Sequence, residues 1–215
     1  ALAERDGRIR VVRNETNRGH GPSLRRAIDI SHGEWVLHLD SDGQVDVTEF
    51  PRLWELRAGN DLVLGVRADR HDPALRLALT KVVRGLVSVL ARRRVRDANT
   101  PFKLISRRLF DHLSPSIPPD SFAPSILLVL GAHRCGASVR ELDVTHLARP
   151  HGTSSLHLRR LLSAVARSTR QTVRFARTRL EPFDARVVDA RVVDGRVVDA
   201  RVVDGPGSSR NGASS

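Results

Sequence analysis

The sequence predicts an α/β domain. Residues 35–39 form a short apolar run that is typical of a buried strand, and residues 61–67 form a second one. Helical patterns at residues 24–30 and 73–92 alternate with these runs, as helices and strands do in α/β proteins. The chain has 215 residues and a hydrophobic content of 40%, so it has room for one such domain with a core of its own.

A short glycine motif precedes the first of these helical patterns. It reads Asn17-Arg18-Gly19-His20-Gly21. Glycines before a helix let the backbone approach a phosphate closely, and the amides at the helix N-terminus attract an anion. Asn17, Gly19 and Gly21 are therefore candidate phosphate-binding residues, although Gly-x-Gly alone is a weak signal.

Two carboxylates follow the strand at residues 35–39. Alternate residues of an extended segment point the same way, so Asp40 and Asp42 can face one point. Hard anionic oxygen ligands suit Mg²⁺ or Mn²⁺, and Gln44 adds a neutral carbonyl oxygen. The C-terminal end of a strand is also where open α/β sheets bind ligands. The alternative is a solvated turn, because Asp, Ser and Gly are common turn residues.

The order of these motifs resembles the family 2 glycosyltransferases of the GT-A fold, which use nucleotide-sugars and a metal held by Asp-x-Asp. Gly43-Gln44 is similar to the ending found in the branch that loads sugars onto polyprenyl phosphates, the dolichyl-phosphate mannosyltransferase type. The resemblance covers residues 9–152 and implies a Rossmann-like sheet with helices on both faces. Further matching segments are Gly65-Val66-Arg67 with Arg70, then Asp97, then Phe102-Lys103-Leu104 before Arg107-Arg108.

The resemblance also implies roles for the acceptor side of the site. By this resemblance, Asp42 and Arg67 would be the catalytic residues. Arg67 is similar to the residue that binds the acceptor phosphate. Arg70, Lys81 or Arg84 would supply a second contact. Lys81 and Arg84 lie one helical turn apart on one face. Their alternative role is the solvated edge of an otherwise apolar helix.

On the donor side, the resemblance points to a late segment. His146, Arg149 and Ser154 match the strand and loop that close over the donor pyrophosphate. Asp40 would also belong to the donor site, because it would bind the metal that contacts this pyrophosphate. His146 could equally be a strand-end histidine without a role.

The start of the chain departs from the family pattern. Family members begin with a strand and loop of the type Val-Ile-Pro-x-x-Asn-Glu, and no segment here matches it. Residues 1–7 look like the end of a helix, and residues 9–12 predict a strand. We therefore expect a truncated domain that lacks its first strand or strands, which would expose an unpaired sheet edge. An inactive fragment is accordingly one interpretation of the chain.

Charge indicates an anionic partner. The formal net charge is +12 and the pI is about 11.5. Nucleotide-sugar phosphates, lipid phosphate and anionic membrane lipids all qualify, although a GC-rich genome would also enrich arginine. Nucleic acid is not expected, because the Trp and Phe residues do not interleave with the basic clusters. The single Cys135 rules out an internal disulfide and is compatible with a reducing cytosol.

Residues 156–181 predict a basic amphipathic helix. An apolar face lies opposite Arg159, Arg160, Arg167, Arg170, Arg174 and Arg177, and no acidic residue interrupts the helix up to residue 180. Such a helix can lie in the interface of an anionic bilayer. The alternative is a surface helix packed on the domain with a solvated basic face. With no apolar run near the roughly 20 residues needed to span a bilayer, we expect a peripheral protein at the cytoplasmic face of the membrane.

Three regions follow from these patterns: a partial GT-A domain at residues 1–155, the basic helix at 156–181, and a tail at 182–215. In the tail, Arg-Val-Val-Asp recurs four times with a period of five, which fits neither a strand nor a helix. We predict no regular structure for the repeat and a disordered end after it.

The sequence therefore predicts metal-dependent, inverting transfer of a sugar from a nucleotide-diphosphate sugar to a polyprenyl phosphate. Two alternatives remain open. One is a family 2 transferase with a glycan or small-molecule acceptor. The other is an inactive basic fragment that binds a membrane or nucleic acid.

Overall fold

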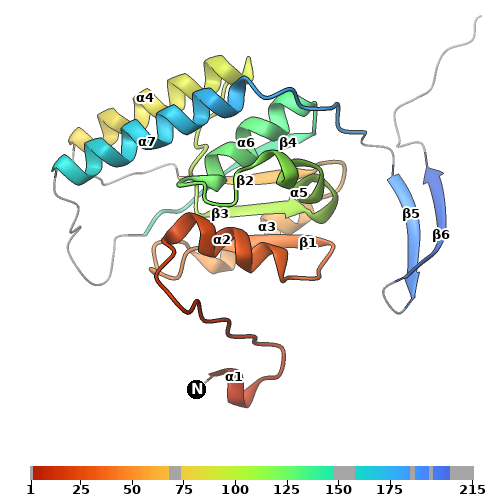
Figure 1. The fold of residues 1–215 in the computed structure, drawn as a ribbon. Coiled ribbons are helices and arrows are strands. Elements are labelled where there is room, and N and C mark those ends of the chain that lie inside the picture. The colour runs from red at the N-terminus through yellow and green to blue at the C-terminus, as the bar shows by residue number, and fades with distance from the viewer. Residues whose placement is uncertain (1, 68–73, 148–157, 185–186, 194–195, 204–215) are drawn as a thin grey trace, which may run out of the picture.

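The fold is built on a four-stranded sheet with the strand order β1-β3-β2-β4, as the computed structural model in Figure 1 shows. The structure describes residues 2–67, 74–147, 158–184, 187–193 and 196–203. The sheet strands are β1 (Trp35–Leu39), β2 (Leu62–Arg67), β3 (Phe102–Ser106) and β4 (Val139–Val144). β3 pairs antiparallel with β1 and β2, and β4 pairs parallel with β2. The mixed α/β architecture confirms the predicted fold class.

Helices cover both faces of this sheet. Alternate residues of β2 point to opposite sides, so Leu62 and Leu64 join the larger core and Val63 joins the smaller one. The larger core is built with α2 (His20–Asp29), α4 (Ala74–Ala91), α5 (Arg107–Leu113), α6 (Pro124–Cys135) and α7 (Leu158–Ala176). The smaller core lies against α3 (Phe50–Glu55), which contributes the fully buried Leu53. Short elements complete the domain: α1 (Leu2–Arg5) and the 3₁₀ turns η1 (Val47–Glu49) and η2 (Ser114–Ser116).

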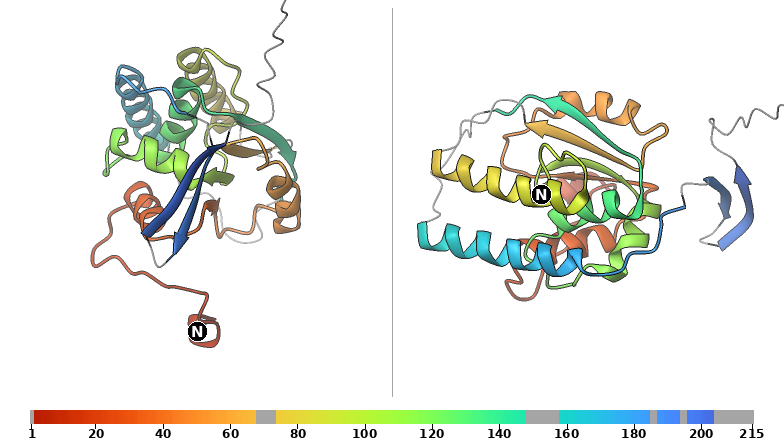
Figure 2. Two further views of the ribbon diagram at one scale, coloured as in Figure 1. Left: turned by 90° about the vertical axis from the view of Figure 1, so that its right-hand side faces the viewer. Right: turned by 90° about the horizontal axis from the view of Figure 1, so that it is seen from above.

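The basic helix α7 packs on the domain. It lies alongside α4 and also contacts α6, and Figure 2 shows the two long helices side by side. Ser168, Thr172 and Phe175 are buried on its inner face, whereas Arg170 and Arg174 are exposed. The helix thus has the packed inner face and basic outer face of the surface-helix alternative. None of the described helices is both long enough and apolar enough to cross a bilayer.

Residues 9–12 are not a strand, which corrects the prediction. Ile9, Val11 and Val12 are 40%, 76% and 43% exposed, and no described strand pairs with them. Their apolar character indicated a strand, but a strand needs a partner for its backbone amides and carbonyls. Here β1 lies at the edge of the sheet and pairs with β3 alone among the described strands.

The Arg-Val-Val-Asp repeat also differs from its prediction. β5 (Val187–Val193) and β6 (Arg196–Val203) form an antiparallel hairpin, set apart from the sheet in Figure 1. The register places Asp189 opposite Arg201, with an irregularity after Arg191. The register also pairs valine with valine at residues 187/203, 188/202 and 192/197. Valine favours extended backbone, so pairing between copies outweighs the unsuitable period within one copy. The predicted disordered end lies outside the described residues.

Stability measurements on two glycines test the fold. A Cβ at Gly21 would lie 1.9 Å from the backbone oxygen of Ser121, so Gly21→Ala is expected to lower the free energy of unfolding by about 1–3 kcal/mol. Gly85 in α4 has nothing within 4 Å of the same position, so Gly85→Ala should raise it by about 0.5–1 kcal/mol. Urea denaturation followed by tryptophan fluorescence measures both. Equal effects of the two substitutions would contradict the close approach of α2 to residue 121.

Candidate active site

Two of the cavities in the described part of the chain contain residues that the sequence analysis singled out. The first, here called the α4 pocket, has a volume of about 470 Å³. The second, the α2 pocket, has a volume of about 420 Å³ and lies at the N-terminus of α2. The α4 pocket is lined by Val66, Arg67, Leu77, Thr80, Lys81, Arg84, Ser88, Arg94, Val95, Arg96 and Asp97. The α2 pocket is lined by Arg18, Gly19, His20, Gly21, Pro22, His38, Asp40, Asn99, Pro101, Asp120, Phe122, Ala123, Pro124, Ser125 and Arg167.

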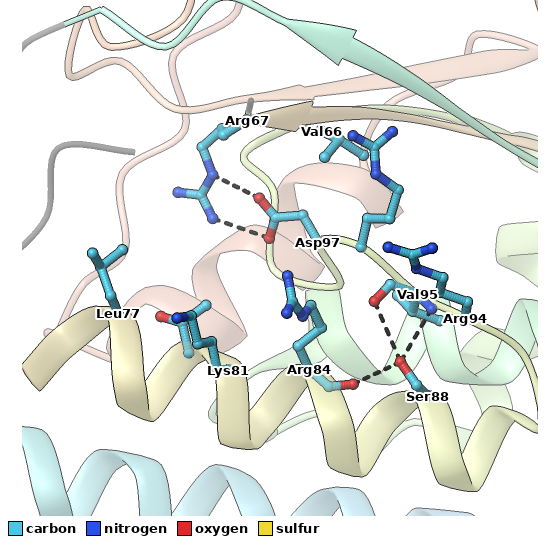
Figure 3. A pocket seen from close by; sticks show the side chains of 11 residues that line it. Val66, Arg67, Leu77, Lys81, Arg84, Ser88, Arg94, Val95 and Asp97 are labelled. Atoms are coloured by element: carbon cyan, nitrogen blue, oxygen red, sulfur yellow. Dashed lines mark hydrogen bonds and ion pairs between the residues drawn. The ribbon is translucent and has the colours of Figure 1, made fainter. Parts of the chain in front are cut away.

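The α4 pocket brings together three of the predicted acceptor-phosphate residues. Arg67 comes from the end of β2, and Lys81 and Arg84 come from successive turns of α4, as Figure 3 shows. Five basic side chains and one carboxylate line the cavity, so it is strongly cationic. Closely spaced guanidinium and ammonium groups are what phosphate recognition requires. Arg70 lies outside the described residues.

A buried ion pair orients Arg67. Its Nε donates to Oδ2 of Asp97 at 2.7 Å and its Nη2 donates to Oδ1 at 3.1 Å. The two side chains are 12% and 6% exposed. This bidentate geometry fixes the plane of the guanidinium, and with it the direction of the charge that the pocket presents.

Sequence reasoning missed Arg94 and Arg96, which also line the α4 pocket. They follow α4 on the loop that returns to the sheet. Val95 N donates to Ser88 Oγ at 3.1 Å, which ties that loop back to the helix. Arg96 also forms an ion pair with Asp143 on β4. The run of arginines at residues 92–94 was a signal that a phosphate-binding interpretation could have used.

The α2 pocket gathers the glycine motif and the first aspartate. Gly19 has a φ of 82°, a left-handed conformation that glycine adopts without strain. Asn17 Oδ1 accepts a hydrogen bond from Gly19 N at 3.0 Å, so this side chain shapes the loop. Gly21 is buried against residue 121, and Asp40 faces the same cavity from the end of β1. Phosphate binding by this loop stays a prediction.

Metal-ligating side chains also meet in the α2 pocket, in a combination that the sequence analysis did not foresee. One ligand atom from each of His20, His38 and Asp40 lies within 4.8 Å of the others. His38 Nε2 is 3.5 Å from Asp40 Oδ1. The hydrogen bond with His38 lowers the pKa of Asp40, and burial lowers the pKa of His38. A carboxylate beside two imidazoles is a ligand set that suits a divalent first-row transition-metal ion.

The second aspartate of the motif, Asp42, has its carboxylate bound to the backbone of its own turn. Asp42 Oδ1 accepts a hydrogen bond from Gln44 N at 3.1 Å, so its carboxylate caps its own turn. His146 is brought next to this turn from a hundred residues away, because it forms a β-bridge with Val45, and Leu147 N donates to Gln44 O at 2.9 Å. Joint metal ligation by Asp40, Asp42 and Gln44 stays a prediction. Arg149 and Ser154 lie outside the described residues.

Lys103 lies buried in the central strand β3. Its Cα partners are His38 on β1 and Leu64 on β2, and its Nζ donates to Ser125 Oγ on α6. Burial lowers the pKa of Lys103 to about 7, an effect that the nearby carboxylates of Asp97 and Asp40 oppose. The pKa of Lys103 therefore depends on one carboxylate from each pocket. A lysine in an otherwise apolar strand was the signal for this residue.

Several known proteins share sequence with this chain. Residues 1–114 match the family model described as Glycosyl transferase family 2. An undecaprenyl-phosphate 4-deoxy-4-formamido-L-arabinose transferase of Pseudomonas aeruginosa is 30% identical over 166 residues, which are 76% of this chain and 47% of that protein. A dolichyl-phosphate beta-glucosyltransferase of Dictyostelium discoideum is 26% identical over 149 residues, 63% of this chain and 45% of that protein. The chain thus spans about half the length of these relatives.

Solved structures share the fold. Glucosyl-3-phosphoglycerate synthase of Mycobacterium tuberculosis in complex with uridine diphosphate superposes with a TM-score of 0.55 and 17% identity, over 92% of this chain and 66% of that one. Its complex with Mn²⁺, uridine diphosphate and glucosyl-3-phosphoglycerate gives 0.55 and 16%, over 87% and 62%. These likenesses establish the GT-A fold for the chain.

The buried amine of Lys103 predicts a pH-dependent stability. Above pH about 7 the folded chain holds it neutral, whereas the unfolded chain keeps it protonated up to its ordinary pKa of 10.5. Because the unfolded state then binds more protons, stability should rise with pH across this window, by about 1.4 kcal/mol per unit. Lys103→Met should remove that component, so its advantage over the wild type shrinks from pH 7 to pH 10.

Lys81→Met is the matched control, because Lys81 is exposed and is the only other lysine of the chain. Denaturant titrations at a series of pH values compare the three proteins. A wild-type minus Lys103→Met difference that stays flat with pH would show that Lys103 keeps its charge in the folded state.

Proposed function

Because the chain belongs to Glycosyl transferase family 2, we propose that it transfers a sugar from a nucleotide-diphosphate sugar to a polyprenyl phosphate with inversion at the anomeric carbon. The observation that carries the proposal is the gathering of Arg67, Lys81 and Arg84 in one cationic cavity. That cavity suits the phosphate of an acceptor. Relatives named for undecaprenyl-phosphate and dolichyl-phosphate transfer support the same acceptor class.

The donor would occupy the α2 pocket. The amides at the start of α2 and the left-handed Gly19 offer a diphosphate close backbone contact and a favourable dipole. Asp40, Asp42 and Gln44 would hold Mg²⁺ or Mn²⁺, with the imidazoles of His20 and His38 beside Asp40. The bound ion supplies positive charge to the leaving diphosphate. His146, beside the turn at residues 44–45, would close this side of the donor site.

The acceptor phosphate needs little activation, because its oxygen is already anionic. In our proposal that oxygen forms the new bond to the anomeric carbon while the bond from this carbon to the diphosphate oxygen breaks. The electron pair of the broken bond leaves with the nucleotide diphosphate, and one in-line displacement inverts the configuration. Arg67 would position the acceptor, and Asp97 would hold Arg67 in its orientation. Catalysis then rests on positioning and charge rather than on a general base.

We further propose that the chain acts peripherally at the cytoplasmic face of a membrane. A lipid-linked acceptor requires a membrane surface, and the exposed arginines of α7 suit an anionic one. The lone Cys135 is buried and free, as is usual in a reducing compartment.

Two other functions compete with this proposal. One differs in the acceptor, and the other has no catalytic activity. A phosphorylated small molecule would also fit a cationic cavity, so a family 2 transferase with a soluble acceptor is the second candidate. A basic binding module for membranes or nucleic acid, without turnover, is the third.

The proposal predicts metal-dependent transfer of sugar to lipid. The chain is supplied with Mn²⁺ or Mg²⁺, a panel of nucleotide-sugars and a polyprenyl phosphate, and radiolabelled sugar in the lipid phase is counted. Asp42→Asn should lower the rate by at least about a hundredfold if the carboxylate holds the ion, since a lost charge contact costs on the order of 3 kcal/mol. Asp111→Asn, which alters an exposed carboxylate of α5 that lines neither pocket, is the control.

Three other outcomes have defined meanings. Donor hydrolysis without lipid product, lost in Asp42→Asn, would retain the transferase and move the acceptor elsewhere. Transfer to a soluble phosphorylated acceptor would favour the second candidate. No turnover together with no metal-dependent nucleotide binding would leave the binding module.

The α4 pocket makes a separate kinetic prediction. Arg84→Met should raise KM for the acceptor about 10–100-fold with little change in KM for the donor, because one charge-assisted contact contributes about 1.5–3 kcal/mol. Arg52→Met removes an exposed arginine of α3 that lines neither pocket and serves as the control. An increase in donor KM in Arg84→Met would place the pocket on the donor side instead.

A further inference from the structure

One face of α4 is apolar and exposed to solvent. Val82 and Val89 are 62% and 74% exposed, and Ala78 and Gly85 are exposed on the same side. Residues spaced by four, three and four positions fall on one face of an α-helix. We call these four residues the α4 stripe. Solvated helix faces ordinarily carry polar side chains, so an apolar stripe at this spacing calls for a partner.

The α4 stripe borders the α4 pocket. Each of its members directly follows a residue that lines the pocket: Leu77 and Ala78, Lys81 and Val82, Arg84 and Gly85, Ser88 and Val89. One residue turns an α-helix by about 100°, so the stripe lies on the side of the helix next to the pocket, from residue 78 to residue 89. Figure 1 shows α4 at the periphery of the domain, where it packs on α6 and α7.

Basic residues accompany the stripe. Lys81 and Arg84 are exposed next to it, and Arg92, Arg93 and Arg94 are exposed where α4 ends. The helix contains no acidic residue. An apolar strip bordered by cations is the pattern of a helix that lies in the interface of an anionic bilayer, with its apolar face among the acyl chains and its cations among the headgroups.

We propose that the α4 stripe docks the protein on an anionic lipid bilayer and brings the mouth of the α4 pocket to the headgroup layer. This proposal rests on the proposed function, because only a lipid phosphate acceptor requires the pocket to lie close to the bilayer surface. It assigns membrane contact to α4. A lipid phosphate then reaches Arg67 without leaving the interface.

Binding of the full chain to vesicles tests the docking surface. Vesicles of phosphatidylglycerol and phosphatidylcholine are compared with phosphatidylcholine alone in a sedimentation assay. The double substitution Val82→Asp/Val89→Asp should lower the partition coefficient on anionic vesicles by about tenfold or more, because it replaces two apolar contacts with the acyl chains by two carboxylates. Val11→Asp/Val47→Asp is the matched control, because it places the same charges at valines that are 76% and 59% exposed elsewhere.

The outcomes separate the alternatives. An equal loss of vesicle binding in both double variants would show that binding depends on net charge alone, and would overturn the proposal. Loss in Arg170→Gln/Arg174→Gln with none in Val82→Asp/Val89→Asp would overturn it in favour of α7. A change in molar mass by light scattering in Val82→Asp/Val89→Asp, with vesicle binding unchanged, would overturn it in favour of self-association. Matching thermal denaturation curves confirm that all the variants fold.

Transfer assays distinguish this proposal from the function beneath it. Val82→Asp/Val89→Asp should keep transfer to a short-chain prenyl phosphate in solution and lose transfer to a long-chain one in vesicles. If no variant and no acceptor gives transfer while vesicle binding still depends on the stripe, the proposed function fails and the docking surface stands. If transfer from vesicles survives the double substitution, the docking surface fails and the function stands.

Discussion

The ion pair between Arg67 and Asp97 is the contact on which the α4 pocket depends. It joins the end of β2 to the loop that follows α4, so the two walls of the pocket are fixed relative to each other. Breaking a buried pair by removing one partner costs about 3–5 kcal/mol, because the remaining charge is left uncompensated. The pair also supplies the negative charge that partly offsets the positive charge of the cavity. Without Asp97, the basic side chains of the lining would repel one another with no carboxylate among them.

The central strand β3 carries a lysine whose pKa depends on a carboxylate from each cavity. Its Lys103 is buried between β1 and β2, and the carboxylates of Asp40 and Asp97, one from each cavity, both act on its pKa. In a low-dielectric interior such interactions are weakly screened. A change of charge at either carboxylate would therefore change the pKa of this amine.

Local patterns predicted what depends on local contacts. The helix α4 and the strand that leads to Asp40 followed from periodicity, and the resemblance grouped Arg67 with Lys81 and Arg84 as acceptor-phosphate residues. The grouping of His20, His38 and Asp40 was out of reach, because it depends on how the start of α2 meets the end of β1 in space. Residues 9–12 show the reverse failure, because their strand-like composition does not place them beside a backbone that pairs with them.

The distribution of lysine has a practical consequence. Among thirty-six basic residues only Lys81 and Lys103 carry a primary amine on their side chains, one at the wall of the α4 pocket and the other in the middle of the sheet. Acylating reagents that spare guanidinium groups therefore have two internal targets with opposite accessibility. Modification at the first reports whether the cavity is occupied, and modification at the second reports opening of the sheet. The composition thus gives the molecule a built-in pair of chemical footprinting probes.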